Sequence, residues 1–146
     1  MGECHVHRGI RAETLNAARE RYPDAEVLVH PECGCAGQLI FEMGHGDVKA
    51  EGLHIASTEG MIRAVTEHPA SRFIIATETG IMHRMELESP DKRFIAANRA
   101  AVCKYMKMIT LPKLRDALRA MAPEVKVSEA IAQRARLPIE RMVAIG

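Results

Sequence analysis

The sequence predicts an α/β domain, a three-layer sandwich in which a parallel β-sheet is flanked by helices. Two observations support this prediction. Short apolar runs that are typical of buried strands recur at residues 26–29, 53–56, 73–76 and 94–97. Segments with apolar residues at helical spacing lie between them. Strands that alternate with helices in this way indicate βαβ units and a parallel sheet covered on both faces.

Each predicted helix of the first 100 residues has its own apolar face. A helix is expected over residues 13–22, because Leu15, Ala18 and Tyr22 lie on one side of it. Two more helices are expected before the third and fourth strands, where apolar residues recur at helical spacing: Met61, Ile62 and Val65, then Ile81, Met82 and Met85.

The last 40 residues are predicted to be helical. Leucines and a methionine repeat every three or four residues: Leu111, Leu114, Leu118 and Met121. Ser128 is expected to cap a further helix that contains Ile131 and Ala135. Pro138 is expected to end or kink that helix before Ile139, Met142 and Val143.

Composition indicates one compact domain and excludes several classes of protein. The chain has 146 residues, of which 47% are hydrophobic and 27% charged, which argues against disorder. The formal net charge of +1 and the 3% aromatic content do not favour a nucleic-acid partner. No apolar run approaches the ~20 residues of a membrane-spanning helix, and no signal peptide opens the chain. We therefore expect a cytoplasmic protein without a membrane partner.

The four cysteines suggest a metal or catalytic site rather than a disulfide framework, since the cytosol is reducing. Cys4 and His7 have C-x2-H spacing, and Cys33 and Cys35 have C-x-C spacing, so the four residues form one candidate zinc site. Alternatively, isolated cysteines, including Cys103, converge on an iron–sulfur cluster from several loops. Spacing leaves both interpretations open, and some of these thiols are expected to be simple core residues.

Polar residues follow each predicted strand, and ligands of open parallel sheets bind at these carboxyl ends. His30, Pro31 and Glu32 follow the first strand, while Ser57 and Thr58 follow the second. The third and fourth strands are followed by Thr77, Glu78, Thr79 and Gly80 and by Asn98. Two of these ends lead into helix N-termini, which attract anions. A small anionic, oxygen-rich ligand is expected, with plain helix capping as the alternative for any single strand end.

His30 and Glu32 suit proton transfer at the same place. Because Pro31 keeps the backbone extended, the two side chains are expected to project on one side. Histidine donates to carboxylates or moves protons, and glutamate binds amines or acts as a base. We therefore predict that His30, Glu32, Ser57 and Thr58 share one cleft.

Six motifs give the chain a resemblance to a known family. "GECHVH", "HPECGC", "STEGMI", "IATETGIMHRM", "AVCKYMKMIT" and "RARLPIERM" occur in this order. The sequence resembles quinolinate synthase over essentially all of its length. The resemblance implies a fold of three similar α/β domains around a pseudo-threefold axis, with the active site at their junction.

The resemblance also implies an activity and a cofactor. Quinolinate synthases condense iminoaspartate with dihydroxyacetone phosphate to make quinolinate for de novo NAD biosynthesis. Each domain gives one cysteine to a [4Fe–4S] cluster whose fourth iron is open to substrate. Cys4 and Cys103 match two of the three ligands, and the third is expected to be missing from this chain. Cys33 and Cys35 are not expected ligands.

Substrate contacts follow from the same motifs. The resemblance implies that His30 and Glu32 are catalytic and that five residues bind substrate: His30, Pro31, Glu32, Ser57 and Thr58. It further implies an upstream enzyme that supplies iminoaspartate, L-aspartate oxidase or aspartate dehydrogenase.

Length indicates that this is the C-terminal part of such an enzyme. Residues 1–22 are expected to be a remnant of the preceding domain and a connecting helix, and residues 23–146 the C-terminal α/β domain. We expect the fragment to be inactive alone. Two alternatives are a small zinc-binding or interaction module that uses Cys4, His7, Cys33 and Cys35, and a metal-free α/β binding domain.

Overall fold

A computed structural model describes residues 4–45 and 51–145 of the chain. It groups them into two compact units, Met1–Lys104 and Tyr105–Gly146. The predicted division into residues 1–22 and 23–146 concerns the domains of the family and stays a prediction. No helix of the described residues is both long and apolar enough to cross a membrane.

The first unit is built on a four-stranded sheet that confirms the predicted fold class. Its strands are β1 (Glu26–Val29), β2 (Leu53–Ile55), β3 (Arg72–Ala76) and β4 (Arg93–Ala96). All neighbours are parallel, in the order β2-β1-β3-β4. Each strand begins and ends within one residue of its predicted bounds, because nearly continuous apolar runs are typical of strands buried on both faces.

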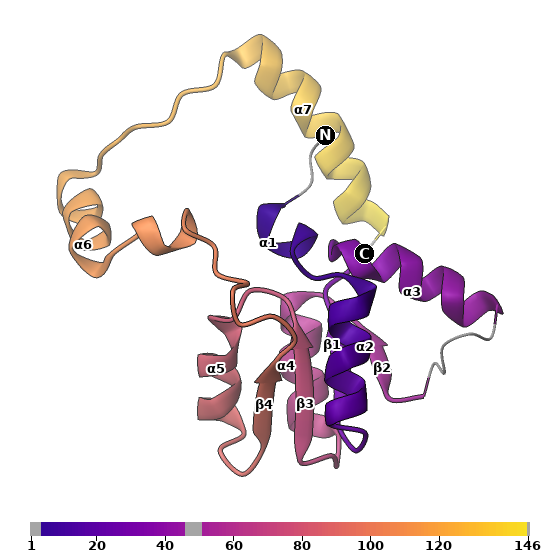
Figure 1. Cartoon of the computed structure of the whole chain (residues 1–146). Helices are drawn as coiled ribbons and strands as arrows, with labels where there is room; N and C mark the ends of the chain where they lie inside the picture. The colour runs from indigo at the N-terminus through magenta and orange to yellow at the C-terminus, as the bar shows by residue number, and fades with distance from the viewer. Residues whose placement is uncertain (1–3, 46–50, 146) are drawn as a thin grey trace. The chain divides into compact units, whose positions relative to one another are not determined.

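Helices cover both faces of this sheet, as Figure 1 shows. Helices α2 (Ala12–Arg21) and α3 (Gly34–His45) pack together on one face, and α4 (Thr58–Glu67) and α5 (Ile81–Glu88) pack together on the other. The sequence pattern did not single out α3, which contains Gly34, Gly37 and Gly44. Glycine is a weak helix former, so this segment lacks a clear helical signal.

The strands supply two hydrophobic cores because successive side chains point to opposite faces. Val27 and Val29 of β1 pack with Leu15 of α2 in one core. Leu28, between them, packs with Met61 of α4 and with Phe73 in the other core. All six side chains are at most 1% exposed. The sheet is therefore the middle layer, and its carboxyl ends reach the same edge.

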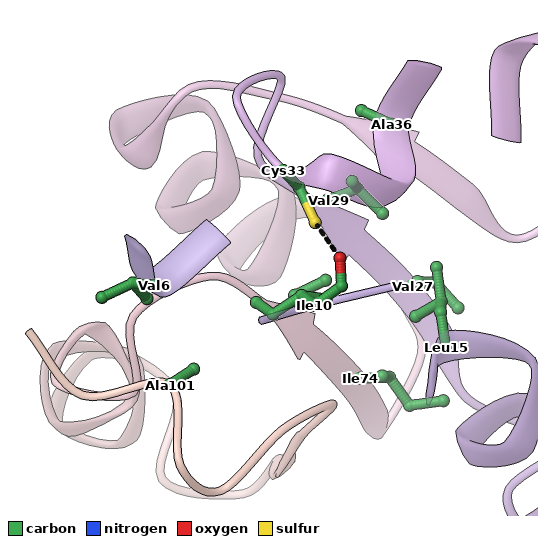
Figure 2. Close-up of a cluster of buried hydrophobic side chains, with 10 residues drawn as sticks. Val6, Ile10, Leu15, Val27, Val29, Cys33, Ala36, Ile74 and Ala101 are labelled. Carbon is green, nitrogen blue, oxygen red and sulfur yellow. Dashed lines mark hydrogen bonds between the residues drawn. The ribbon is translucent and has the colours of Figure 1, made fainter. Parts of the chain in front are cut away.

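Residues 4–10 lie across that carboxyl edge and contain the short helix α1 (His5–Arg8). Nε2 of His7 lies 3.0 Å from Oγ1 of Thr77, which follows β3. Asn98, which follows β4, donates from Nδ2 to the carbonyl of Gly9 at 2.9 Å. Ile10 is completely buried in the core of α2 and β1 (Figure 2). The segment therefore belongs to the first unit and packs on the ends of its strands.

The second unit contains η1 (Met106–Met108), α6 (Leu111–Ala120) and α7 (Glu129–Ile145). Ser128 precedes α7, and its carbonyl accepts from the N–H of Ala132 at 2.9 Å, which places Ser128 at the predicted start. The helix continues through Pro138, so of the two predicted outcomes an end at this proline is wrong and a kink stays a prediction. Good helix formers on both sides, such as Ala135 and Met142, favour continuation.

The C-terminus of α4 generates a stability prediction. The ammonium of Lys92 donates to the carbonyls of Val65 at 2.6 Å and of His68 at 2.5 Å. Replacing Lys92 with methionine keeps the aliphatic stem but leaves both carbonyls without this donor. We expect Lys92→Met to lower the free energy of unfolding by about 1–3 kcal/mol, measured by chemical denaturation. The control Lys126→Met, at an exposed ion pair with Glu124, should change it by less than about 0.5 kcal/mol. If both substitutions lowered the free energy of unfolding by the same amount, Lys92 would not stabilise the C-terminus of α4 as described.

Candidate functional site

The sheet topology identifies one place where a ligand is expected to bind. In the order β2-β1-β3-β4, the chain reverses direction across the sheet between β1 and β3. Ligands of doubly wound sheets bind in the crevice outside the carboxyl ends of the strands at such a switch point. His30 directly follows β1, and Thr77 directly follows β3. Both residues therefore stand at the switch point.

Three side chains meet there, and we call them the histidine cluster: His7, His30 and Glu32. The rings of His7 and His30 stack, with centroids 4.7 Å apart and planes inclined by 7°. Nδ1 of His7 lies 3.8 Å from Oε2 of Glu32. One nitrogen or oxygen of each residue lies within 4.8 Å of the others. The cluster thus brings together the predicted pair His30 and Glu32 with His7, which the sequence linked only to a zinc site.

His30 is oriented as a hydrogen-bond donor. Its Nδ1 accepts from the backbone N–H of Glu32 at 3.3 Å. A backbone N–H can only donate, so the neutral ring of His30 carries its proton on Nε2. A ring held in this tautomer donates to an oxygen ligand such as a carboxylate. The Glu32 side chain is 72% exposed and is open to solvent.

His7 supports this site from inside the protein. It is 8% exposed, and its Nδ1 is buried without a hydrogen-bond partner among the described residues. Burial lowers the pKa of His7 below its ordinary value of 6.5; His30 lowers it further, and Glu32 opposes the shift. His7 is therefore a neutral imidazole at pH 7, with one nitrogen on Thr77 and the other facing the cluster. No local pattern predicted this contact.

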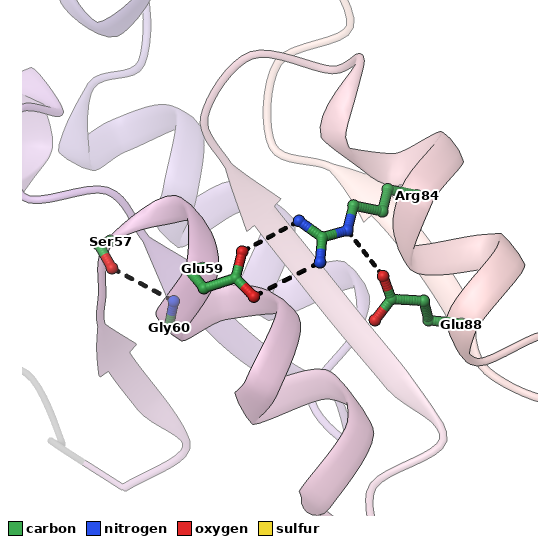
Figure 3. A network of polar contacts seen from close by, with 5 residues as sticks. All are labelled: Ser57, Glu59, Gly60, Arg84 and Glu88. Atoms are coloured by element: carbon green, nitrogen blue, oxygen red, sulfur yellow. Dashed lines mark hydrogen bonds and ion pairs between the residues drawn. The ribbon is translucent and has the colours of Figure 1, made fainter.

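The N-terminus of α4 reaches the same edge of the sheet, beside β1. Val29 pairs with Ile55, so Ser57 and Thr58 follow β2 where His30 and Glu32 follow β1. The hydroxyl oxygen of Ser57 accepts from the N–H of Gly60 at 3.2 Å, and this bond leaves its O–H as a donor (Figure 3). That all four residues share one cleft remains a prediction.

Arg84 of α5 ties the first turn of α4 to its neighbour (Figure 3). Its NH1 donates to Oε2 of Glu59 at 3.0 Å, and its Nε donates to Oε1 of Glu88 at 2.7 Å. These two bonds raise the pKa of Arg84, so its guanidinium stays charged. The pairing keeps the start of α4, which carries Ser57 and Thr58, next to α5.

The polar residues after β3 and β4 bind the protein itself. Thr77 contacts His7, and the carboxylate of Glu78 accepts from the N–H groups of Gly80 and Cys103. Asn98 donates to Gly9 and accepts from the N–H of Ala100 at 2.9 Å. These residues therefore have a structural role, since they hold residues 4–10 and 101–103 in place, and their contact with a ligand stays a prediction.

Cys4 and Cys103 occupy the two segments that are held in this way. Cys4 precedes α1, and Cys103 follows the buried Ala101; both are partly buried and pack against the same core. Val6 and Ala101, two residues from each cysteine, lie in that core (Figure 2). Neither cysteine forms a disulfide with another described residue. Thiolates are the ligands that iron–sulfur clusters use, so this pair fits such a group.

Cys33 has another role. It is 4% exposed and its Sγ donates to the carbonyl of Ile10 at 3.5 Å (Figure 2). The side chain of Cys35 lies outside the described part of the structure. Among the described side chains, no group of three or more close potential ligands includes a cysteine. The geometry therefore gives no support to a zinc site formed by Cys4, His7, Cys33 and Cys35.

A second group of potential ligands, Glu26, His54 and His68, lies away from this edge. Nε2 of His54 is 2.8 Å from Oε2 of Glu26, which starts β1. Nδ1 of His68 accepts from the N–H of Ala70 at 3.2 Å, so the neutral ring carries its proton on Nε2. Metal-binding histidines usually donate through their second nitrogen. In His68 the second nitrogen, Nδ1, accepts a hydrogen bond and does not donate one. We therefore interpret these three residues as an internal hydrogen-bonded group and not as a metal site.

Comparison with known proteins matches nearly the whole chain to one family. The family model described as quinolinate synthetase A protein matches residues 1–144. A quinolinate synthase of Pyrobaculum aerophilum is 48% identical over 141 residues, covering 97% of this chain and 45% of the relative. A quinolinate synthase of Thermus thermophilus is 46% identical over 145 residues, covering 99% and 44%.

A quinolinate synthase of Mycobacterium tuberculosis is 43% identical over 145 residues, covering 99% of this chain and 42% of the relative. The chain therefore spans less than half the length of these curated relatives. The region that matches the family extends over both compact units. It includes the segments that carry the histidine cluster and the two cysteines. The chain belongs to the quinolinate synthase family.

Proposed function

We propose that this chain is the C-terminal part of a quinolinate synthase that condenses iminoaspartate with dihydroxyacetone phosphate to form quinolinate. The observation that carries the proposal is the histidine cluster at the switch point of the sheet. It joins a fixed donor, His30, to an exposed carboxylate, Glu32. Both substrates carry anionic groups, and iminoaspartate also carries a nitrogen, so this pair suits them.

His30 and Glu32 are the catalytic residues of the proposal. The Nε2–H of His30 donates to a substrate carboxylate, and Glu32 binds the nitrogen or transfers a proton. Pro31 and Glu32 lie in a turn that is closed by the N–H of Cys33, which donates to the carbonyl of His30 at 2.8 Å, so the expectation of an extended backbone at Pro31 is wrong. Ser57 and Thr58 complete substrate binding through the O–H of Ser57 and the start of α4, where unpaired N–H groups favour an anion.

Cys4 and Cys103 are the proposed ligands of a [4Fe–4S] cluster. The third ligand comes from the part of the enzyme that this chain does not include. When bound, the cluster supplies a Lewis-acidic iron that polarises a hydroxyl leaving group during dehydration. The contribution of this chain is to hold two thiols on the same core, near the end of the sheet that carries His30.

The activity belongs to the complete enzyme in this proposal. The chain alone offers two of three cluster ligands, so we propose that it is inactive by itself. In the cytoplasm, an L-aspartate oxidase or an aspartate dehydrogenase supplies iminoaspartate, because this imine must be generated by oxidation of the amino acid.

Iron content tests the ligand assignment. In the complete enzyme that carries this sequence, Cys103→Ser should abolish cluster assembly, because three ligands leave none to spare. Cys35→Ser should retain the iron of the unmodified enzyme. Iron is measured per polypeptide after anaerobic reconstitution, together with the visible absorbance of the cluster. Loss of iron from Cys35→Ser with retention in Cys103→Ser would overturn the assignment.

The lowered pKa of His7 predicts that acid destabilises the first unit. The unfolded chain binds a proton at His7 with the ordinary pKa of 6.5, and the folded chain binds it less readily. The stabilising contribution of His7 is therefore complete above this value and is lost as the pH falls through the folded pKa. The free energy of unfolding, measured with denaturant, should fall more between pH 7.5 and pH 5 for the unmodified chain than for His7→Gln.

His83→Gln is the control for this pH dependence, because His83 is an exposed histidine on α5. The His83→Gln variant should show the same difference in free energy of unfolding between pH 7.5 and pH 5 as the unmodified chain. If His7→Gln also leaves that difference unchanged, His7 is not the neutral buried imidazole described above.

A further inference from the structure

The loop after β3 holds the segment that carries Cys103. The N–H of Thr79 donates to the carbonyl of Ala101 at 2.9 Å. The N–H of Cys103 donates to Oε1 of Glu78 at 3.3 Å. The other oxygen of that carboxylate, Oε2, accepts from the N–H of Gly80 at 2.7 Å. One carboxylate therefore joins the start of α5 to the backbone of Cys103.

These bonds fix the direction of the Cys103 side chain. Ala101 is 2% exposed and anchored in the core, and the Glu78 carboxylate binds the backbone two residues later. With both points held, the backbone at Cys103 is constrained, and so is the direction in which its Cα–Cβ bond points. Hydrogen bonds to an ionised carboxylate are about twice as strong as those between neutral groups, so the Glu78 carboxylate holds the backbone N–H of Cys103 more strongly than a neutral acceptor would.

The same loop also holds the segment that carries Cys4. Thr77 contacts His7 at 3.0 Å, and His7 lies in α1, the helix that Cys4 precedes. The two thiol-bearing segments are 99 positions apart in the chain, from Cys4 to Cys103, and residues 77–79 bind both of them. The loop is thus the common support for both cysteines.

We propose that Glu78 is a positioning residue that sets the metal-binding geometry of Cys103. This inference rests on the proposed function, which makes Cys103 a cluster ligand. Glu78 acts through the backbone N–H of Cys103 and does not itself bind the metal. Outer-shell residues that hydrogen-bond directly to ligating side chains typically contribute about 10-fold to 100-fold to metal affinity, and this range sets the scale expected for Glu78.

Cobalt(II) binding to the 146-residue chain tests the proposal without the complete enzyme. The background is Cys33→Ser with Cys35→Ser, which leaves Cys4 and Cys103 as the thiols; the serine at position 33 keeps a donor for Ile10. The readout is the thiolate-to-cobalt charge-transfer absorbance during titration. In this background, Glu78→Ala should weaken cobalt binding by about 10-fold or more.

Two matched variants keep the test specific. Glu78→Gln retains one acceptor oxygen, so it should weaken binding less than Glu78→Ala. Glu86→Ala removes an exposed glutamate of α5 and should bind cobalt with the affinity of the background. If Glu78→Ala is unfolded by circular dichroism, Glu78→Gln decides: weaker binding than the background supports the proposal. Binding within twofold of the background by every folded Glu78 variant would overturn it.

Cys103→Ser separates this inference from the proposed function. Both are supported when Cys103→Ser loses the charge-transfer absorbance and Glu78→Ala weakens binding. If Cys103→Ser keeps the absorbance and affinity of the background, the proposed ligand assignment fails, and with it the role of Glu78. If Cys103→Ser loses the absorbance while Glu78→Ala and Glu78→Gln bind normally, only the positioning role fails.

Discussion

The buried hydrogen bond between His7 and Thr77 is the contact on which the candidate site depends. It seats residues 4–10 on the carboxyl ends of the strands, where Asn98 and Cys33 also bind that segment. With the segment in place, the ring of His7 stacks on His30, and Cys4 reaches the core against which Cys103 packs. A buried polar pair is costly when left unsatisfied, so this single contact favours one position of the segment.

The fold concentrates polar chemistry at one edge because its strands are parallel. Every strand delivers its following residues to the same side, and the order of the strands reverses there between β1 and β3. Of the polar groups at this edge, Glu78 and Asn98 bind backbone groups of the protein, while the Glu32 side chain is 72% exposed and His30 is partly buried beside His7. The residues after β3 and β4 thus stabilise the structure, while those after β1 are the proposed ligand contacts.

Local patterns in the sequence predicted the parts of the structure that depend on short-range physics. Apolar runs located all four strands, and helical spacing located α4 and α5. The pattern missed the glycine-containing α3, and of the two outcomes predicted at Pro138, an end or a kink, the structure lacks the end. The pair His30 and Glu32 was found because both follow one strand. The contact of His7 with Thr77 joins residues 70 positions apart, and no local pattern encodes it.

Amide hydrogen exchange of residues 4–10 tests most directly whether this segment is an integral part of the first unit. The N–H of Ile10 donates to the carbonyl of His7 at 3.0 Å, and that of Arg8 donates to Cys4 at 2.9 Å. We expect both amides to exchange slowly, with protection comparable to that of β1, and to exchange faster in a Thr77→Val variant. Exchange of residues 4–10 at the rate of an unstructured peptide, while β1 stays protected, would contradict the account.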